Sequence, residues 1–448
     1  MASTRSGEPE EQHQRPLRRK EKRTLALLGM PTFALALGIT VVTTYVPLLA
    51  RRQTSSTTVI GVIIAAEGLV ALVVPVAAGA WSDQLRTRAG GRLPFIVAGA
   101  PALAGAMILM SLTSSLLLLA ILVLIFFVAY YAAYEPYRAL YPDLLTAEVA
   151  GRGQSTQAIF RGLATGTALI GGGLLFGASA QLPFVIFALL SLATVGAFVW
   201  GIKGSRALRE QEEHAARTAR QTVTKMVALL RRRPAMRAFL IANALWELSL
   251  AALKTFIMLF LTVGMGMAMP QAVAVIAVVM VLILVAAAVS GRLGDRFGRA
   301  RVVRVGAWVY GVGLLVPLFT QSIYVVAPIV PLIAFGGGMV LTLPYAILMP
   351  LMPDEEHGLI TGFYSFSRGL GILVGPLLAG VAIMALRPLL SSTHGYAAMW
   401  LICGVSILAS TAFVKPLRRQ EERRRQEERR RQEERERDRF ESGGEGQT

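Results

Sequence analysis

The chain has 448 residues, of which 54% are hydrophobic and 16% are charged, and its mean hydropathy is +0.56. This composition excludes an ordinary soluble domain, and recurrent apolar runs of about twenty residues predict a membrane protein with many spanning helices. The formal charge of +18 does not indicate nucleic-acid binding, because the basic residues lie in short tracts between the apolar runs, as orientation signals do.

The apolar runs divide the chain into two similar halves. The first run, 24–50, is too long for a signal-peptide core and lacks a small-residue cleavage site, so it is predicted to be a spanning helix. Eleven more runs bring the predicted total to twelve. The predicted segments are a cytosolic tail (1–23), a six-helix bundle (24–203), a cytosolic connector (204–235), a second six-helix bundle (236–417) and a charged cytosolic tail (418–448).

Two loops with one pattern follow the second and the eighth predicted helices. Gly79 and Asp83 in the first loop correspond to Gly291 and Asp295 in the second. The glycine permits close helix packing, and the aspartate can pair with a loop arginine beside the start of a neighbouring helix. Each loop is therefore predicted to latch one conformation. The predicted latch residues are Gly79, Asp83, Arg86, Arg88 and Arg92 in the first half, and Gly291, Asp295, Arg296 and Arg299 in the second.

A longer segment also occurs twice. The dipeptide Pro-Tyr at 136–137 returns at 344–345, 208 residues later, and the tripeptide Arg-Gly-Leu at 161–163 returns at 368–370, 207 residues later. Each copy places an arginine inside an apolar segment, where a charge is costly without a partner or a water-filled cavity. The sequence therefore predicts an all-α membrane protein of two pseudo-symmetric six-helix bundles, with the repeated segment in its functional core.

Charged and aromatic side chains within the predicted helices indicate a substrate site. Helix four carries two tyrosines, a glutamate and an arginine on one face, where rings can cover a sugar and charged groups can hold its hydroxyls. The alternative is that these groups only neutralise one another inside the bundle. The predicted substrate residues are Tyr131, Tyr134, Glu135, Arg138, Gln157, Arg161, Asn243, Trp246, Glu247, Lys254, Tyr364 and Arg368.

Arginine and lysine predict the orientation of the chain. One set of alternate connections holds most of the basic residues, so it is expected to face the cytoplasm together with both termini. Arg51 and Arg52 depart from this pattern, because they lie in a connection of the other set, which is expected to face away from the cytoplasm. We expect a multi-pass protein of the cell membrane that works as a monomer in the lipid bilayer, with a small-molecule substrate and without nucleic acid.

The C-terminal run 418–440 repeats a QEERRR-like hexad at Gln420, Gln426 and Gln432. Glutamate and arginine lie at i,i+4 spacings that support a solvated helix. The run has no apolar seam, so a coiled coil is not expected. A soluble tail or a contact with lipid headgroups accounts for it.

The cysteine and histidine residues predict neither a metal site nor an intrachain disulfide. The single cysteine, Cys403, lies in an apolar run, and the four histidines are scattered in polar segments. No nucleophile and base stand at a catalytic spacing, so an enzyme is not expected. A receptor or structural protein would not need charges in both halves. No cofactor is expected beyond a coupling ion, either a proton or sodium.

The aspartate loops resemble those between helices 2 and 3, and 8 and 9, of the major facilitator superfamily. That resemblance implies two six-helix halves with substrate between them near the midplane. Ser82 to Ile96, SDQLRTRAGGRLPFI, is also similar to the loop of the sucrose/proton symporters, relatives of the glycoside-pentoside-hexuronide cation symporters. Arg138 to Leu144, RALYPDL, resembles that group's RALLADL. The chain departs from these patterns at Gln84, Gly91 and Pro142.

The sugar-symporter resemblance implies proton-coupled symport of a sugar or glycoside by alternating access, with Asp143 as the coupling carboxylate. Glu135 and Glu67 are further coupling candidates, because they are acidic residues inside predicted helices. The alternative is a proton-coupled exporter of drugs or other small molecules. Such exporters carry a glycine-proline motif on helix 5, but residues 166–173 hold no proline, and the nearer match, 371–380, lies on helix 11.

Overall fold

The computed structural model describes residues 18–85, 91–145, 147–202, 234–348 and 357–444. Its first half contains α1 (Arg19–Arg51), α2 (Thr57–Gln84), α3 (Leu93–Leu112), α4 (Leu116–Leu144), α5 (Ala147–Gly166), α6 (Gly172–Ala178) and α7 (Leu182–Ile202). Its second half contains α9 (Pro234–Leu259), α10 (Met269–Phe297), α11 (Arg299–Phe319), α12 (Ile323–Thr342), α13 (Pro344–Leu348), α14 (His357–Ala385) and α15 (Ala398–Gly444). Twelve helices in these ranges are long and apolar enough to cross a membrane, which confirms the predicted number.

The two halves are built from the same helix pairs. In the first half, α1 packs against α5 and α7, α3 packs against α4 and α7, and α2 packs against α4. The equivalent pairs in the second half are α9 with α14 and α15, α11 with α12 and α15, and α10 with α12. This correspondence confirms the pseudo-symmetric bundles that the repeated segment predicts. Apolar side chains such as Val62, Leu69 and Val73 remain exposed, because the solvent at these faces is lipid.

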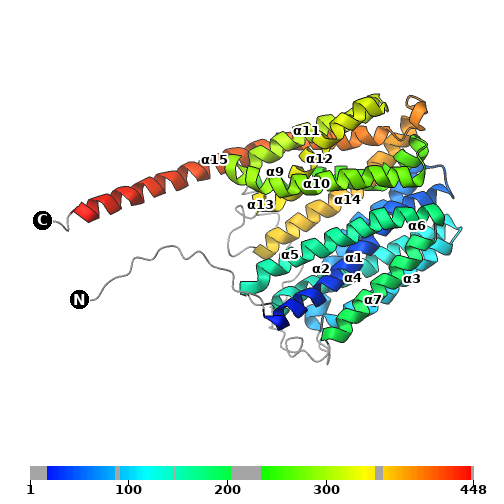
Figure 1. The fold of residues 1–448 in the computed structure, drawn as a ribbon, viewed down its shortest axis with the longest axis horizontal. Coiled ribbons are helices and arrows are strands. Elements are labelled where there is room, and N and C mark those ends of the chain that lie inside the picture. Colours follow the sequence, from blue (N-terminus) through cyan, green and yellow to red (C-terminus); the bar gives the residue numbers. More distant parts are fainter. Residues whose placement is uncertain (1–17, 86–90, 146, 203–233, 349–356, 445–448) are drawn as a thin grey trace.

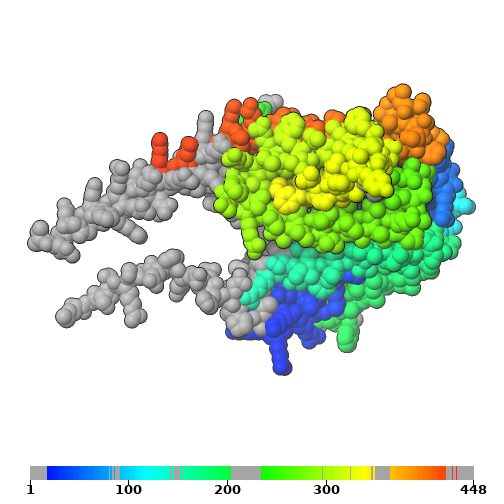
Figure 2. Space-filling model, turned by 45° about the horizontal axis from the view of Figure 1, so that its top comes forward, coloured from blue at the N-terminus to red at the C-terminus, as the bar shows by residue number. Residues whose placement is uncertain are grey.

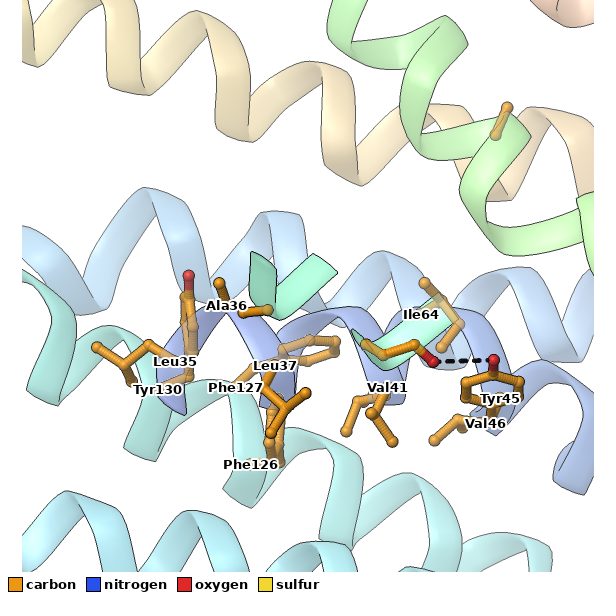
Figure 3. Packing of buried hydrophobic residues seen from close by; sticks show 14 of the residues in the cluster. Leu35, Ala36, Leu37, Val41, Tyr45, Val46, Ile64, Phe126, Phe127 and Tyr130 are labelled. Carbon is orange, nitrogen blue, oxygen red and sulfur yellow. Dashed lines mark hydrogen bonds between the residues drawn. The ribbon is translucent and has the colours of Figure 1, made fainter. Parts of the chain in front are cut away.

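Two of the spans contain a π-helical turn that the sequence pattern does not reveal. The first, η1 (Thr167–Gly171), joins α5 to α6, and the second, η3 (Phe260–Gly264), continues α9. A π-turn leaves carbonyl groups without their usual helical partner. The buried Tyr45 hydroxyl on α1 donates to the carbonyls of Ala168, at 3.0 Å, and Leu169, at 2.8 Å. Figure 3 shows Tyr45 with one of these hydrogen bonds as a dashed line. A tyrosine of one helix therefore satisfies the irregular turn of another.

The halves meet most closely along α2 and α14. A Cβ at Gly61 would clash with the Pro376 carbonyl, so glycine permits the two backbones to touch. Thr57 also donates from its Oγ1 to the Gly380 carbonyl at 2.8 Å. A second contact joins α10 to η1 and α6, and Figure 2 shows α5 and α6 along the boundary between the halves.

Both chain ends lie at one end of the molecule, where α1 begins and α15 extends away from the bundle (Figure 1). We call this the terminal end. The closed end is the opposite one, formed by the connections 52–56, 113–115, 179–181, 265–268, 320–322 and 386–397. Contacts between α10 and the fifth span are concentrated on η1 and α6, near the closed end. The halves are therefore sealed together away from the chain termini.

The helix of the last span continues beyond the membrane segment. Its candidate span is Ala398–Arg419, and α15 runs without a break from there to Gly444. The solvated helix expected from the hexad repeat is therefore the direct extension of the twelfth span.

Candidate functional site

A buried carboxylate lies where the two halves face each other. Glu67 on α2 is only 8% exposed and accepts a hydrogen bond of 3.3 Å from the Tyr131 hydroxyl on α4. It also interacts electrostatically with Lys254 and Arg368 of the second half, and with Glu247, which has the same sign. The charge balance at this point therefore depends on both halves.

The second half contributes an ion pair and an exposed lysine. Arg368 Nε on α14 lies 3.4 Å from Glu247 Oε1 on α9, and the two side chains are 41% and 17% exposed. Lys254, two turns further along α9, is exposed although it interacts with Glu247 and Glu67 and is repelled by Arg368 and Arg161. Because these neighbours come from both halves, the exposed Lys254 side chain lies at the boundary between them.

The first half contributes a cluster of tyrosines and arginines. Arg161 Nη2 on α5 donates to the Tyr134 hydroxyl at 3.3 Å, and the Arg138 guanidinium lies over the Tyr134 ring at 5.6 Å. Arg138 also lies 3.5 Å from Glu135 of the same helix. The rings of Tyr130 and Tyr134 stack with centroids 5.5 Å apart. The sequence pattern did not identify Tyr130, because its place follows from the packing of its neighbours.

Several predicted substrate residues instead make contacts that hold helices together. Asn243 donates to the Ser367 hydroxyl on α14, and Trp246 donates to the Ser410 hydroxyl on α15, each at 2.8 Å and within buried surroundings. Gln157 is buried near Tyr141, and the Tyr364 ring stacks on Phe239 at 6.5 Å. The structure therefore brings Tyr131, Tyr134, Arg161, Glu247, Lys254 and Arg368 to the centre and holds Asn243 and Trp246 inside the second bundle.

The predicted latch lies mostly beyond what the structure describes. Arg86 and Arg88 fall outside the described residues, as do the side chains of Asp83 and Asp295 and that of the coupling candidate Asp143. Gly79 and Gly291 have open space around them. Arg92 donates from Nη1 to the Ala139 carbonyl of α4, Arg296 lies over the Phe297 ring, and Arg299 packs beside Gly294. The latch and Asp143 stay predictions.

The arrangement at the centre suits the binding of a polar molecule. It offers guanidinium, ammonium and carboxylate groups, together with tyrosine rings and hydroxyls, at the boundary between two bundles. Among the described residues, no three histidine, cysteine or acidic side chains are grouped to hold a metal ion. Small-molecule sites between repeated bundles near the membrane midplane are typical of secondary transporters.

The sequence matches the family described as Major Facilitator Superfamily over residues 28–289 and 265–442. The chain belongs to this superfamily. It is therefore a multi-pass membrane transporter that works by alternating access, and not an enzyme. The superfamily resemblance seen in the aspartate loops is confirmed, and the match does not distinguish the sucrose symporters from other groups of the superfamily.

Solved members of this superfamily have the same fold. A bacterial homolog of the human lysosomal transporter Spinster, inward-facing and unoccupied, superposes with a TM-score of 0.75 at 12% identity, covering 91% of this chain and 99% of that one. The nucleoside transporter NupG gives a TM-score of 0.69 at 15% identity, covering 88% of this chain and 98% of that one. These likenesses concern the fold.

A curated relative matches a shorter stretch. Multidrug resistance protein 3 of Bacillus subtilis (strain 168) is 27% identical over 93 residues, which is 21% of this chain. The matched stretch spans only 18% of that relative's length.

Proposed function

We propose that this transporter couples the movement of a proton to that of a sugar or glycoside, carried through the space between the two halves. The observation that carries the proposal is the position of Glu67. Its carboxylate is buried in one half and interacts with the cationic Lys254 and Arg368 of the other. This arrangement links the charge of one group to the relative position of the halves.

Coupling follows from the cost of burying a charge. An ionised carboxylate away from water needs cationic or hydrogen-bonding partners, whereas a neutral one does not. Tyr131 belongs to the same half as Glu67 and stays with it, but Lys254 and Arg368 move with the second half when the bundles rock. Protonation of Glu67 would therefore favour one relative position of the halves, and ionisation would favour the other.

Glu67 has a stronger claim to this role than Glu135. Glu135 lies 3.5 Å from Arg138 on the same helix, and both side chains are partly exposed. Because both residues belong to α4, this ion pair does not change when the halves move relative to one another. Asp143 retains its claim through the resemblance of 138–144 to the symporter motif, and it is proposed as a second coupling residue.

The substrate class follows from the groups that remain open at the centre. Arg161 and Lys254 are exposed, and Arg368 is partly exposed beside Glu247. Guanidinium and ammonium groups donate to hydroxyl oxygens, a carboxylate accepts from hydroxyls, and the Tyr134 ring can cover an apolar ring face. This combination favours a neutral, hydroxyl-rich molecule over a purely apolar one.

The proposal is tested in proteoliposomes that contain the purified chain. A panel of labelled sugars and glycosides is offered with an imposed pH gradient, and proton uptake is recorded alongside. We expect gradient-driven accumulation in the wild type, and loss of accumulation with retained exchange in Glu67→Gln. Glu135→Gln serves as the matched control and should keep accumulating. Full accumulation in Glu67→Gln would refute this coupling role, and dependence on a sodium gradient alone would exclude the proton.

Proton-coupled export of drugs is the second candidate function. It is favoured by the 27% identity over 93 residues to Multidrug resistance protein 3 of Bacillus subtilis. The same vesicles, loaded with a lipophilic dye, distinguish the two functions. Gradient-driven dye movement without any sugar accumulation would establish the exporter.

A further inference from the structure

The closed end carries basic groups without acidic ones. Its connections, as defined above, contain no aspartate or glutamate. Arg51, Arg52, Arg387 and His394 lie there, including the pair that departs from the positive-inside pattern. Like charges at a contact between two bundles repel one another unless an anion lies between them. The central site does not account for these residues.

A small cavity of about 30 Å³ lies among these groups, between the two halves. The first half lines it with Arg51, Ser55 and Thr57, and the second half lines it with Arg387, His394 and Tyr396. Both halves therefore contribute a guanidinium to the same cavity. Arg52 does not line it, because its guanidinium lies over the Phe176 ring at 5.5 Å.

Two donor groups at this cavity are buried without an acceptor among the described residues. They are Arg51 Nε and the hydroxyl of Tyr396, a residue that is only 2% exposed. The Arg51 guanidinium lies beside that hydroxyl, and its Nη1 donates to the Thr54 carbonyl at 3.2 Å. Buried donors without acceptors are costly and rare, so an unmet pair of donors points to an acceptor that occupies the cavity.

We propose that this cavity binds a small inorganic anion of the size of chloride, and that the anion stabilises the conformation sealed at this end. Guanidinium and phenol donors from both halves supply its hydrogen bonds, and its charge offsets the repulsion between Arg51 and Arg387. A space of this size holds one or two water-sized groups, which favours chloride over sulfate and organic phosphates. The site is lost when the halves separate here.

Thermal unfolding of the purified full-length chain tests the binding. Chloride is increased in place of gluconate at constant ionic strength, so that general screening does not change. The wild type should show a saturable rise in melting temperature, and Arg51→Gln should weaken the apparent chloride affinity by about tenfold or more. Arg52→Gln, which removes the neighbouring guanidinium outside the cavity, is the matched control and should respond like the wild type.

Tyr396→Phe is a second variant, for use if Arg51→Gln does not fold. This substitution removes only a hydroxyl, and the response of the variant to chloride should also be weaker. Spin labels at two exposed positions of opposite halves, Leu117 and Leu389, report the conformation. Chloride should increase the short-distance population in the wild type but not in the Arg51 or Tyr396 variants. An identical melting temperature in chloride and gluconate, or an unchanged response in both variants, would show that the cavity holds only water. Neither measurement requires a transported substrate.

Discussion

Arg368 Nε on α14 lies 3.4 Å from Glu247 Oε1 on α9, whereas the repeat-related Arg161 on α5 donates to the Tyr134 hydroxyl. The two copies of the unit therefore keep the arginine but give it different partners. In the second half the partner is a carboxylate, and in the first half it is a neutral phenol. The asymmetry leaves Arg161 without a carboxylate among its described contacts and open to a ligand.

Glu247→Gln should weaken substrate binding by about tenfold or more, because loss of a charged partner costs about 1.5–3 kcal/mol. Arg368 would lose its ion pair, and Lys254 would lose an attractive neighbour. The Michaelis constant for exchange and the maximal rate are measured separately in vesicles. A fall in rate with unchanged affinity would contradict the assignment of Glu247 to the substrate site.

Trp246→Phe should lower stability by about 1 kcal/mol and leave substrate affinity unchanged. Its indole N–H donates to the Ser410 hydroxyl inside the second bundle, 2.8 Å away. Thermal unfolding gives the stability, and Ser410→Ala is the matched variant that removes the same bond from the other side. A weakened affinity in both variants would return Trp246 to the ligand contacts expected from its spacing on the helix.

Gly61→Ala should destabilise the sealed conformation by about 1–3 kcal/mol, because the new methyl group overpacks the contact with the Pro376 carbonyl. The conformation is read from labelling of single cysteines near the closed end. Gly105→Ala on α3 is the control, since nothing lies within 4 Å of the Cβ it would add. Equal labelling of the two variants would show that the α2–α14 contact does not set the conformation.

Tyr45→Phe should destabilise the first half by about 0.5–1.5 kcal/mol through its effect on the π-turn. The carbonyls of Ala168 and Leu169 would lose the phenol as a donor and keep the backbone N–H of Gly172. Chemical unfolding of the purified protein measures the loss. Tyr324→Phe, which removes a hydroxyl from a residue that is 88% exposed, should have no effect.

Both termini should face the cytoplasm, as the arginine and lysine pattern indicates. Tags attached at each end are probed with a reagent that does not cross the membrane. Labelling in intact cells at either end would overturn this orientation, whereas labelling only after permeabilisation supports it.

Local sequence patterns predict the spans and the repeat well. The twelve apolar runs and the Pro-Tyr and Arg-Gly-Leu repeats depend only on residues that are close in the sequence, so they can be recognised before the helices pack. The partners that a side chain finds on another helix cannot be predicted in this way. Asn243 and Trp246 share the periodicity of Glu247, yet their partners Ser367 and Ser410 lie more than a hundred residues away in the chain. The same reason hides the Glu67–Tyr131 contact and the π-turns, which arise only from tertiary packing.

The unbroken α15 extends the last helix of the second bundle well beyond its membrane span. The helix continues from the end of its span at Arg419 to Gly444, a length of about 37 Å at the rise of an α-helix. A tilt of the bundle by about 10° would swing the far end through about 6 Å, provided the rod stays straight. Any tilt of the second bundle would therefore produce a larger displacement at the far end of this helix than at the end of its span.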